Sequence, residues 1–164
     1  MPSTSAATIV KARPEEVWVV LSDIANATRW NSAWKRIEFS SKQTHGPATR
    51  FRAHTESGDA FEFEVSAWVA PEYIEFSPVR ADEESYGITL EAQAFRLEPA
   101  GEGATRVELI ARASTHGVRG WLMGLVFWRG YQKQGLNAAL ETLRLVFEPD
   151  VDKKREEDAT PASD

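Results

Sequence analysis

Six stretches in the middle of this chain alternate apolar and polar residues with a period of two. The clearest is 61–69, where every second residue from Phe61 to Val69 is apolar and the residues between include Glu62 and Glu64. Similar stretches lie at 36–40, 50–54, 73–77, 86–97 and 106–113. Alternation of this kind is typical of antiparallel strands with one buried and one solvated face. In stretch 86–97 the apolar phase switches at Phe95, which predicts a bulge near Ala94.

Helical patterns stand at the two ends of this series. A short strand at 8–12 precedes Pro14, which suits the first turn of a helix, and we expect that helix to run from about Pro14 to Ser22. Residues 24–28 could add one further turn. The last element is expected to be one helix of about 27 residues, from Gly120 or Trp121 to Phe147, stopped by Glu148-Pro149.

The opening of the chain resembles the START/SRPBCC superfamily. The matching residues are Ala12, Pro14, Glu15, Val17, Trp18, Leu21, Asp23, Trp30 and Asn31. The resemblance covers about residues 7–147 and implies an α+β helix-grip fold. In that fold a seven-stranded curved antiparallel sheet wraps around a long C-terminal helix, and two short helices lie between strands 1 and 2. It also implies a deep apolar cavity and no particular reaction, because members include lipid carriers, hormone receptors, polyketide cyclases and chaperone activators.

Small residues on the expected inner face support such a cavity. Alanines occupy that phase at Ala53, Ala67, Ala92, Ala94, Ala111 and Ala113. Small side chains beneath a helix leave volume, unless the helix packs down onto them. The residues expected to bind the ligand are Trp30, Phe39, Phe51, Phe61, Phe63, Phe76, Ile88, Leu90, Leu109, Leu125, Trp128 and Tyr131. Ile74, Val107 and Leu136 are further candidates, and all of these would also serve as ordinary core.

Catalytic signals are weak. The main polar groups that could reach the interior are Tyr86, Asn31 and Arg129. His116 and Tyr131 are further candidates, and each of the five also fits a position at the rim of the cavity. The histidines His45, His54 and His116 lack metal-ligand spacing, so no metal and no cofactor is expected. Glu62 and Glu64 share the outer face with Arg50 and Arg52, which favours cross-strand ion pairs over acid–base catalysis.

Glycines gather at the start of the last helix. Gly117, Gly120, Gly124, Gly130 and Gly135 lie within or beside it and should make this segment the least rigid part of the helix. We expect 118–131 to form the cavity mouth and to expose Trp121, Met123 or Phe127 to a partner, a membrane surface or the ligand. A simple helix end covered by the loop of Trp30 and Trp34 is the alternative. Trp68 shares the phase of Glu64 and is expected outside, where with Ile110 it could mark a subunit contact.

Charge and composition limit the remaining choices. The net charge is −6, but residues 148–164 hold seven acidic and three basic side chains, so the body carries only −2. We therefore expect one domain over 1–147, an acidic disordered tail over 148–164 and no nucleic-acid partner. The absence of a long apolar run or a leader pattern predicts a cytoplasmic protein without a transmembrane segment. Transient membrane contact and a homodimer remain open.

Three functions are compatible with these patterns. The first is binding or transport of a hydrophobic small molecule, such as a lipid, isoprenoid or aromatic polyketide. The second is a polyketide cyclase or dehydratase that needs no metal. The third is a protein-interaction module resembling the chaperone activators. The sequence favours the first, and enzymatic activity is left undecided.

Overall fold

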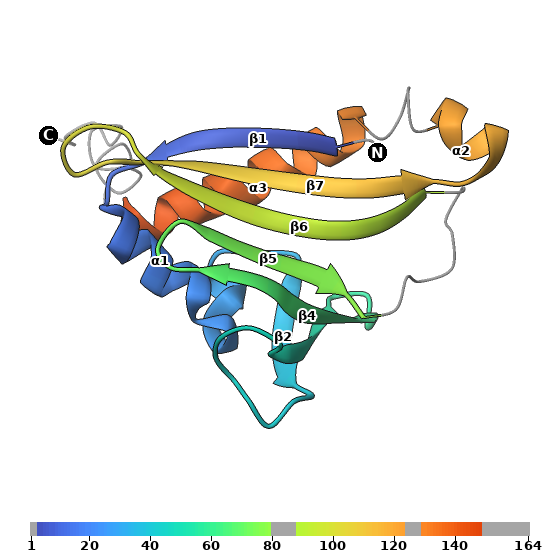
Figure 1. The fold of residues 1–164 in the computed structure, drawn as a ribbon, viewed down its shortest axis with the longest axis horizontal. Coiled ribbons are helices and arrows are strands. Elements are labelled where there is room, and N and C mark those ends of the chain that lie inside the picture. Colours follow the sequence, from blue (N-terminus) through green and yellow to red (C-terminus); the bar gives the residue numbers. More distant parts are fainter. Residues whose placement is uncertain (1–2, 80–87, 124–128, 149–164) are drawn as a thin grey trace, which may run out of the picture.

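The computed structural model describes residues 3–79, 88–123 and 129–148. One antiparallel sheet of seven strands, in the order β1-β7-β6-β5-β4-β3-β2, forms its frame. Two short helices follow the first strand, and the last helix lies along the sheet beside β1 and β7 (Figure 1). The elements are β1 (Ser3–Val10), α1 (Pro14–Ser22), η1 (Ile24–Arg29), β2 (Trp34–Phe39), β3 (Arg50–Thr55), β4 (Ala60–Val69), β5 (Tyr73–Pro78), β6 (Ile88–Pro99), β7 (Thr105–Thr115), α2 (Gly117–Met123) and α3 (Arg129–Phe147).

Helix α1 begins at Pro14 and ends at Ser22, as its sequence predicts. The missing N–H of Pro14 costs nothing in the first turn. The carboxylate of Glu16 accepts a hydrogen bond from the backbone N–H of Arg13 at 2.8 Å, which satisfies a donor just ahead of the helix. Val17, Trp18 and Leu21 are buried, so the helix packs with this apolar face inward.

The inner face of the sheet carries the core. Residues paired directly across antiparallel strands share a face, and the pairs Ile74–Phe95 and Phe95–Leu109 place large buried side chains together. Helix α3 contributes Leu136, Leu140 and Leu143, and it packs chiefly on β1. This is the α+β helix-grip architecture that the sequence predicts.

Two of the irregularities in strand pairing change which side chains are expected to face inward. The first lies between Leu90 and Ala92 in β6, slightly earlier than the bulge expected near Ala94. The second, between Val65 and Ala67 in β4, was not expected. It reverses the alternation of β4 beyond this point, because one extra residue shifts every following side chain to the other face.

The reversal in β4 corrects the expectation for Trp68. Trp68 pairs with Ile74 on the inner face, is half-buried, and packs against the core. Its indole ring meets that of Trp18 edge to face, with 5.2 Å between the ring centroids. Trp68 is therefore a link between the sheet and α1, and the proposed subunit contact at this residue is wrong.

The same registers correct the interpretation of the alanines. Ala67 and Ala94 both pair with Glu75, and Ala92 pairs with Arg112, which places all three on the outer face. Only Ala53, Ala111 and Ala113 lie on the inner face with the core residues. Half of the small residues taken to support a cavity thus lie on the other side of the sheet.

The structure describes the expected C-terminal helix only in part. The described residues form α2, which already begins at Gly117, and α3, which begins at Arg129; 124–128 lie outside the described residues. In α2, Trp121 is 60% exposed. After α3, Glu148 pairs with Arg144 and Lys11. None of the described helices combines the length and the apolar character needed to cross a bilayer.

Candidate functional site

Aromatic rings fill the inner face where η1 meets the sheet. Trp30, directly after η1, lies edge to face on Phe95 of β6, with 5.1 Å between centroids, and its ring centroid is 5.7 Å from that of Trp34. Trp34 continues the cluster to Phe51 at 5.8 Å and to Phe63 at 5.6 Å. All five residues are buried, so this cluster forms part of the inner face of the sheet.

One polar atom in this cluster is unsatisfied. The indole Nε1 of Trp30 is buried, and no hydrogen-bond acceptor for it exists within the described part of the chain. Trp30 is only 2% exposed, so bulk water does not supply the missing partner. A buried donor without an acceptor costs about 1–3 kcal/mol, and such groups in native proteins commonly bind an ordered water or a ligand.

The expected ligand-binding residues fall into three groups. Phe51, Phe63, Phe76 and Leu109 are buried in the core, as are Ile74, Val107 and Leu136. Phe39, Ile88 and Leu90 are half-buried, whereas Phe61 is 39% exposed at the start of β4. Leu125 and Trp128 lie outside the described residues, as does the side chain of Tyr131.

The structure gives no catalytic arrangement to the polar candidates that it describes. Asn31 is half-buried, and its Oδ1 accepts a hydrogen bond from the backbone N–H of Ala33 at 3.1 Å, which is a local turn contact. His116 is exposed at the end of β7, with its Nε2 3.4 Å from the hydroxyl of Ser114. Tyr86 and the side chain of Arg129 lie outside the described residues.

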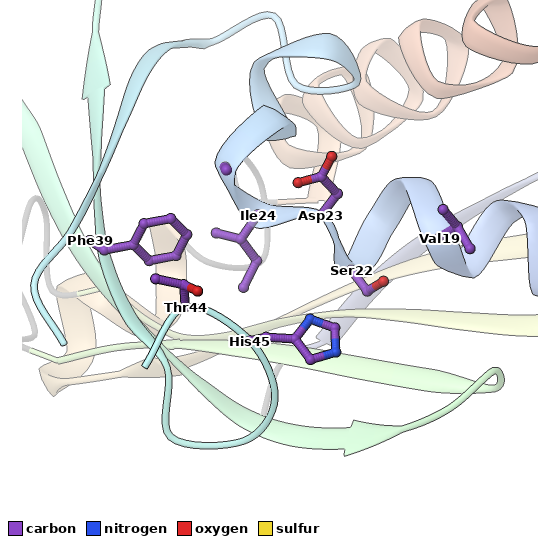
Figure 2. Close-up of a pocket in the computed structure, with 8 residues that line it drawn as sticks. Val19, Ser22, Asp23, Ile24, Phe39, Thr44 and His45 are labelled. Carbon is purple, nitrogen blue, oxygen red and sulfur yellow. The ribbon is translucent and has the colours of Figure 1, made fainter. Parts of the chain in front are cut away.

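A pocket of about 560 Å³ lies at a place that the sequence did not indicate. Figure 2 shows it between the junction of α1 with η1 and the connection from β2 to β3. Its lining residues are Val19, Ser22, Asp23, Ile24, Ala25, Phe39, Thr44 and His45. Among the described residues that were expected to bind a ligand, only Phe39 lines it. No spacing or motif signals the others, because the pocket forms only when two distant segments meet.

The outer face of the sheet carries a separate polar network. Glu75 accepts hydrogen bonds from Tyr73 at 2.5 Å and from Ser66 at 2.9 Å, and it pairs with Arg112. Burial by itself raises the pKa of Glu75, but these hydrogen bonds and the positive charge of Arg112 outweigh it and hold the pKa below its ordinary value. Burial and the neighbouring carboxylate raise the pKa of Tyr73. The polar side chains of this network therefore have one another as hydrogen-bond or ion-pair partners.

Acidic residues elsewhere on the outer face also have structural partners. Arg50 pairs with Glu64 at 2.6 Å, and Glu62 accepts a hydrogen bond from Ser40 at 2.6 Å. The pair between Arg50 and Glu64 is the cross-strand contact that the sequence predicts. Within residues 3–79, 88–123 and 129–148, no group of three or more His, Asp and Glu side chains could hold a metal ion.

Comparison with known proteins decides the family. The model of the family described as polyketide cyclase/dehydrase and lipid transport matches residues 1–148. The chain belongs to this family. Membership agrees with the START/SRPBCC resemblance and identifies a fold suited to hydrophobic ligands. No curated protein matches the sequence significantly.

Solved structures agree on the fold. A protein from Nitrosospira multiformis is 17% identical, with a TM-score of 0.69 over 94% of this chain and 99% of that one. A START superfamily protein from Mycobacterium smegmatis is 17% identical, with a TM-score of 0.63 over 93% and 98%. The di-domain aromatase/cyclase BexL is 16% identical, with a TM-score of 0.68 over 92% of this chain and 49% of that one. At these identities the likeness concerns architecture.

Proposed function

We propose that this member of the family binds or carries a hydrophobic small molecule, such as a lipid, isoprenoid or aromatic polyketide. The site lies between the sheet and the C-terminal helix. The observation that carries the proposal is the buried Nε1 of Trp30, a donor without an acceptor in an aromatic surround. An apolar ligand with a carbonyl or ether oxygen would satisfy this donor, and its hydrocarbon body would lie against the neighbouring rings.

The family description supports the same class of ligand. It covers both polyketide chemistry and lipid transport, and both handle molecules with large apolar surfaces. Burial of such surface supplies affinity at about 25 cal/mol per Å² before the costs of association. A single buried donor would then orient the ligand rather than supply most of the binding energy.

Two probes of nearly equal shape test the proposal. 2-Acetylnaphthalene carries a ketone oxygen, and 2-isopropenylnaphthalene carries a methylene group in its place. We expect the protein to bind the ketone about fivefold more tightly, because one hydrogen bond is worth about 1 kcal/mol. The indole N–H signal of Trp30 should shift when the ketone is added in a ¹⁵N–¹H spectrum.

Two variants make the test specific. Trp30→Phe removes the donor and keeps an aromatic ring, so it should abolish the preference for the ketone. Trp34→Phe changes the neighbouring indole and should leave the preference intact. If neither probe binds, the proposal is wrong. If an ordered water alone satisfies Trp30, its indole signal will not respond to the ketone.

A cyclase or dehydratase is the second candidate, favoured by the family description and by the similarity to the BexL di-domain. It would need a proton donor or acceptor beside the bound ligand. Tyr86 and Arg129 are the residues to replace, since Asn31 is engaged in its own turn. Incubation of the protein with a linear poly-β-ketone would show a cyclised aromatic product that Tyr86→Phe or Arg129→Gln does not form.

A further inference from the structure

The pocket at the end of α1 is distinct from the aromatic cluster around Trp30. It is lined by the last residues of α1, the first residues of η1, Phe39 at the end of β2, and Thr44 and His45 (Figure 2). Its volume of about 560 Å³ lies within the usual range of small-molecule sites, about 300–1,000 Å³. None of the rings that surround Trp30 lines it.

The wall that carries His45 is held in place before any ligand binds. The ring of His45 lies against the indole of Trp68, with 4.6 Å between centroids. Gln43 donates hydrogen bonds to the backbone oxygens of His45, at 2.7 Å, and Pro47, at 2.5 Å. The buried hydroxyl of Thr49 donates to the backbone oxygen of Gly46 at 2.8 Å. A wall fixed in this way loses little conformational entropy on binding.

Polar side chains without partners line the pocket. Ser22 is only 7% exposed, and its hydroxyl has no hydrogen bond to any other described residue. Thr44 is exposed, and its hydroxyl also has no protein partner among the described residues. His45 is exposed as well, and its ring nitrogens have no hydrogen bond to another described residue. These groups can donate as well as accept hydrogen bonds.

The rest of the lining is apolar, with one acidic group. Val19, Ile24, Ala25 and Phe39 supply the apolar surface. Asp23 adds a carboxylate, which accepts a hydrogen bond from Asn26 at 2.8 Å and has no described Lys or Arg within ion-pair distance. A negative charge at the pocket disfavours an anionic ligand.

From this combination we infer a second binding site, which takes a neutral aromatic molecule bearing a hydroxyl group. The ring lies on the surface formed by Ile24 and Phe39. The hydroxyl of the ligand accepts a hydrogen bond from Ser22 and donates one to a ring nitrogen of His45. A phenol fits these demands at neutral pH, whereas a carboxylate is opposed by Asp23.

Three matched probes test this site by titration in ¹⁵N–¹H spectra. They are 4-ethylphenol, its methyl isostere 4-ethyltoluene, and the anion 4-ethylbenzoate. We expect 4-ethylphenol to shift the amide signals of residues 19–25 and 44–45 and to bind about fivefold more tightly than 4-ethyltoluene, as the loss of one hydrogen bond implies. The anion should bind more weakly than the phenol.

Ser22→Ala and His45→Phe remove the two polar partners while keeping the shape of the pocket, so each should remove most of the preference for the phenol. Ser57→Ala, in the turn between β3 and β4, is the matched control and should change nothing. Equal affinities for phenol and isostere, a preference that survives in both variants, or shifts confined to the surroundings of Trp30 would each overturn the inference. Uptake of 2-acetylnaphthalene should persist in both variants, which separates this result from the fate of the proposed function.

Discussion

The indoles of Trp18 and Trp68 meet edge to face at 5.2 Å, with 82° between their planes. The first belongs to α1 and the second to β4, and the ring of His45 also contacts Trp68, with 4.6 Å between centroids. One aromatic series thus connects the first helix, the sheet and a wall of the pocket. Replacements at Trp68 should therefore affect both stability and the pocket.

Trp68→Ala should lower the free energy of unfolding by about 2 kcal/mol, because it removes a half-buried indole and its edge-to-face contact. It should also weaken binding of 4-ethylphenol, since His45 loses its support. Urea denaturation measures the first effect. Val69→Ala, at a side chain that is 52% exposed, is the control and should change stability by less than about 0.5 kcal/mol.

A buried hydrogen bond joins β7 to the connection between β1 and α1. The hydroxyl of Thr105, at the start of β7, donates to the backbone oxygen of Ala12 at 2.7 Å, and Thr105 is fully buried. Thr105→Val keeps the shape but leaves that oxygen without a donor, so we expect a loss of about 1–2 kcal/mol in unfolding free energy. Thr115→Val, at the half-buried end of β7, should have little effect in the same denaturation experiment.

The network around Glu75 predicts a pH dependence. Because the pKa of Glu75 is lower in the folded protein than its ordinary value of 4.5, its ionised form stabilises the fold at pH above 4.5. This contribution is lost as the pH falls through the lowered pKa. The stability difference between wild type and Glu75→Gln should be constant from pH 7 to 5 and shrink below 4.5. If the stability difference grew as the pH falls, the lowered pKa of Glu75 in the folded protein would be contradicted.

Glu148, directly after α3, forms ion pairs with α3 and with the residue that follows β1. Its carboxylate pairs with Arg144 at 2.5 Å and with Lys11 at 3.6 Å. A chain ending at Phe147 should therefore melt at a lower temperature than one ending at Glu148, and Glu148→Gln in the full chain should reproduce the drop. Removal of 149–164 alone is expected to leave the melting temperature unchanged. Calorimetry at low and high salt would measure how much of the change in melting temperature comes from these ion pairs.

Local sequence patterns were sufficient to predict the architecture. Pro14 placed the start of α1 because a proline needs no N–H partner there, and this placement is confirmed. The alternation in 50–54 and 106–113 identified strands whose inner faces carry Phe51 and Leu109 as expected. Such patterns are reliable because each depends only on neighbouring residues and on burial.

The candidate site was less predictable. Three alanines were assigned to the wrong face, because the bulges in β4 and β6 depend on how each strand pairs with its neighbours. The polar lining of the α1 pocket was missed because Ser22 and His45 are more than 20 positions apart and approach only in the folded chain. In the sequence, the only expectation for His45 was that it is not a metal ligand.

By itself, then, the sequence determined the order of elements, the helix-grip architecture and the family resemblance over about residues 7–147. Only the tertiary structure decided that Trp68 faces inward, that the indole N–H of Trp30 is buried without a described acceptor, and that a pocket lies beside α1. The physical reason is the range of the interactions. Alternation and capping act between neighbours along the chain, whereas strand register and the meeting of loops depend on contacts between distant segments.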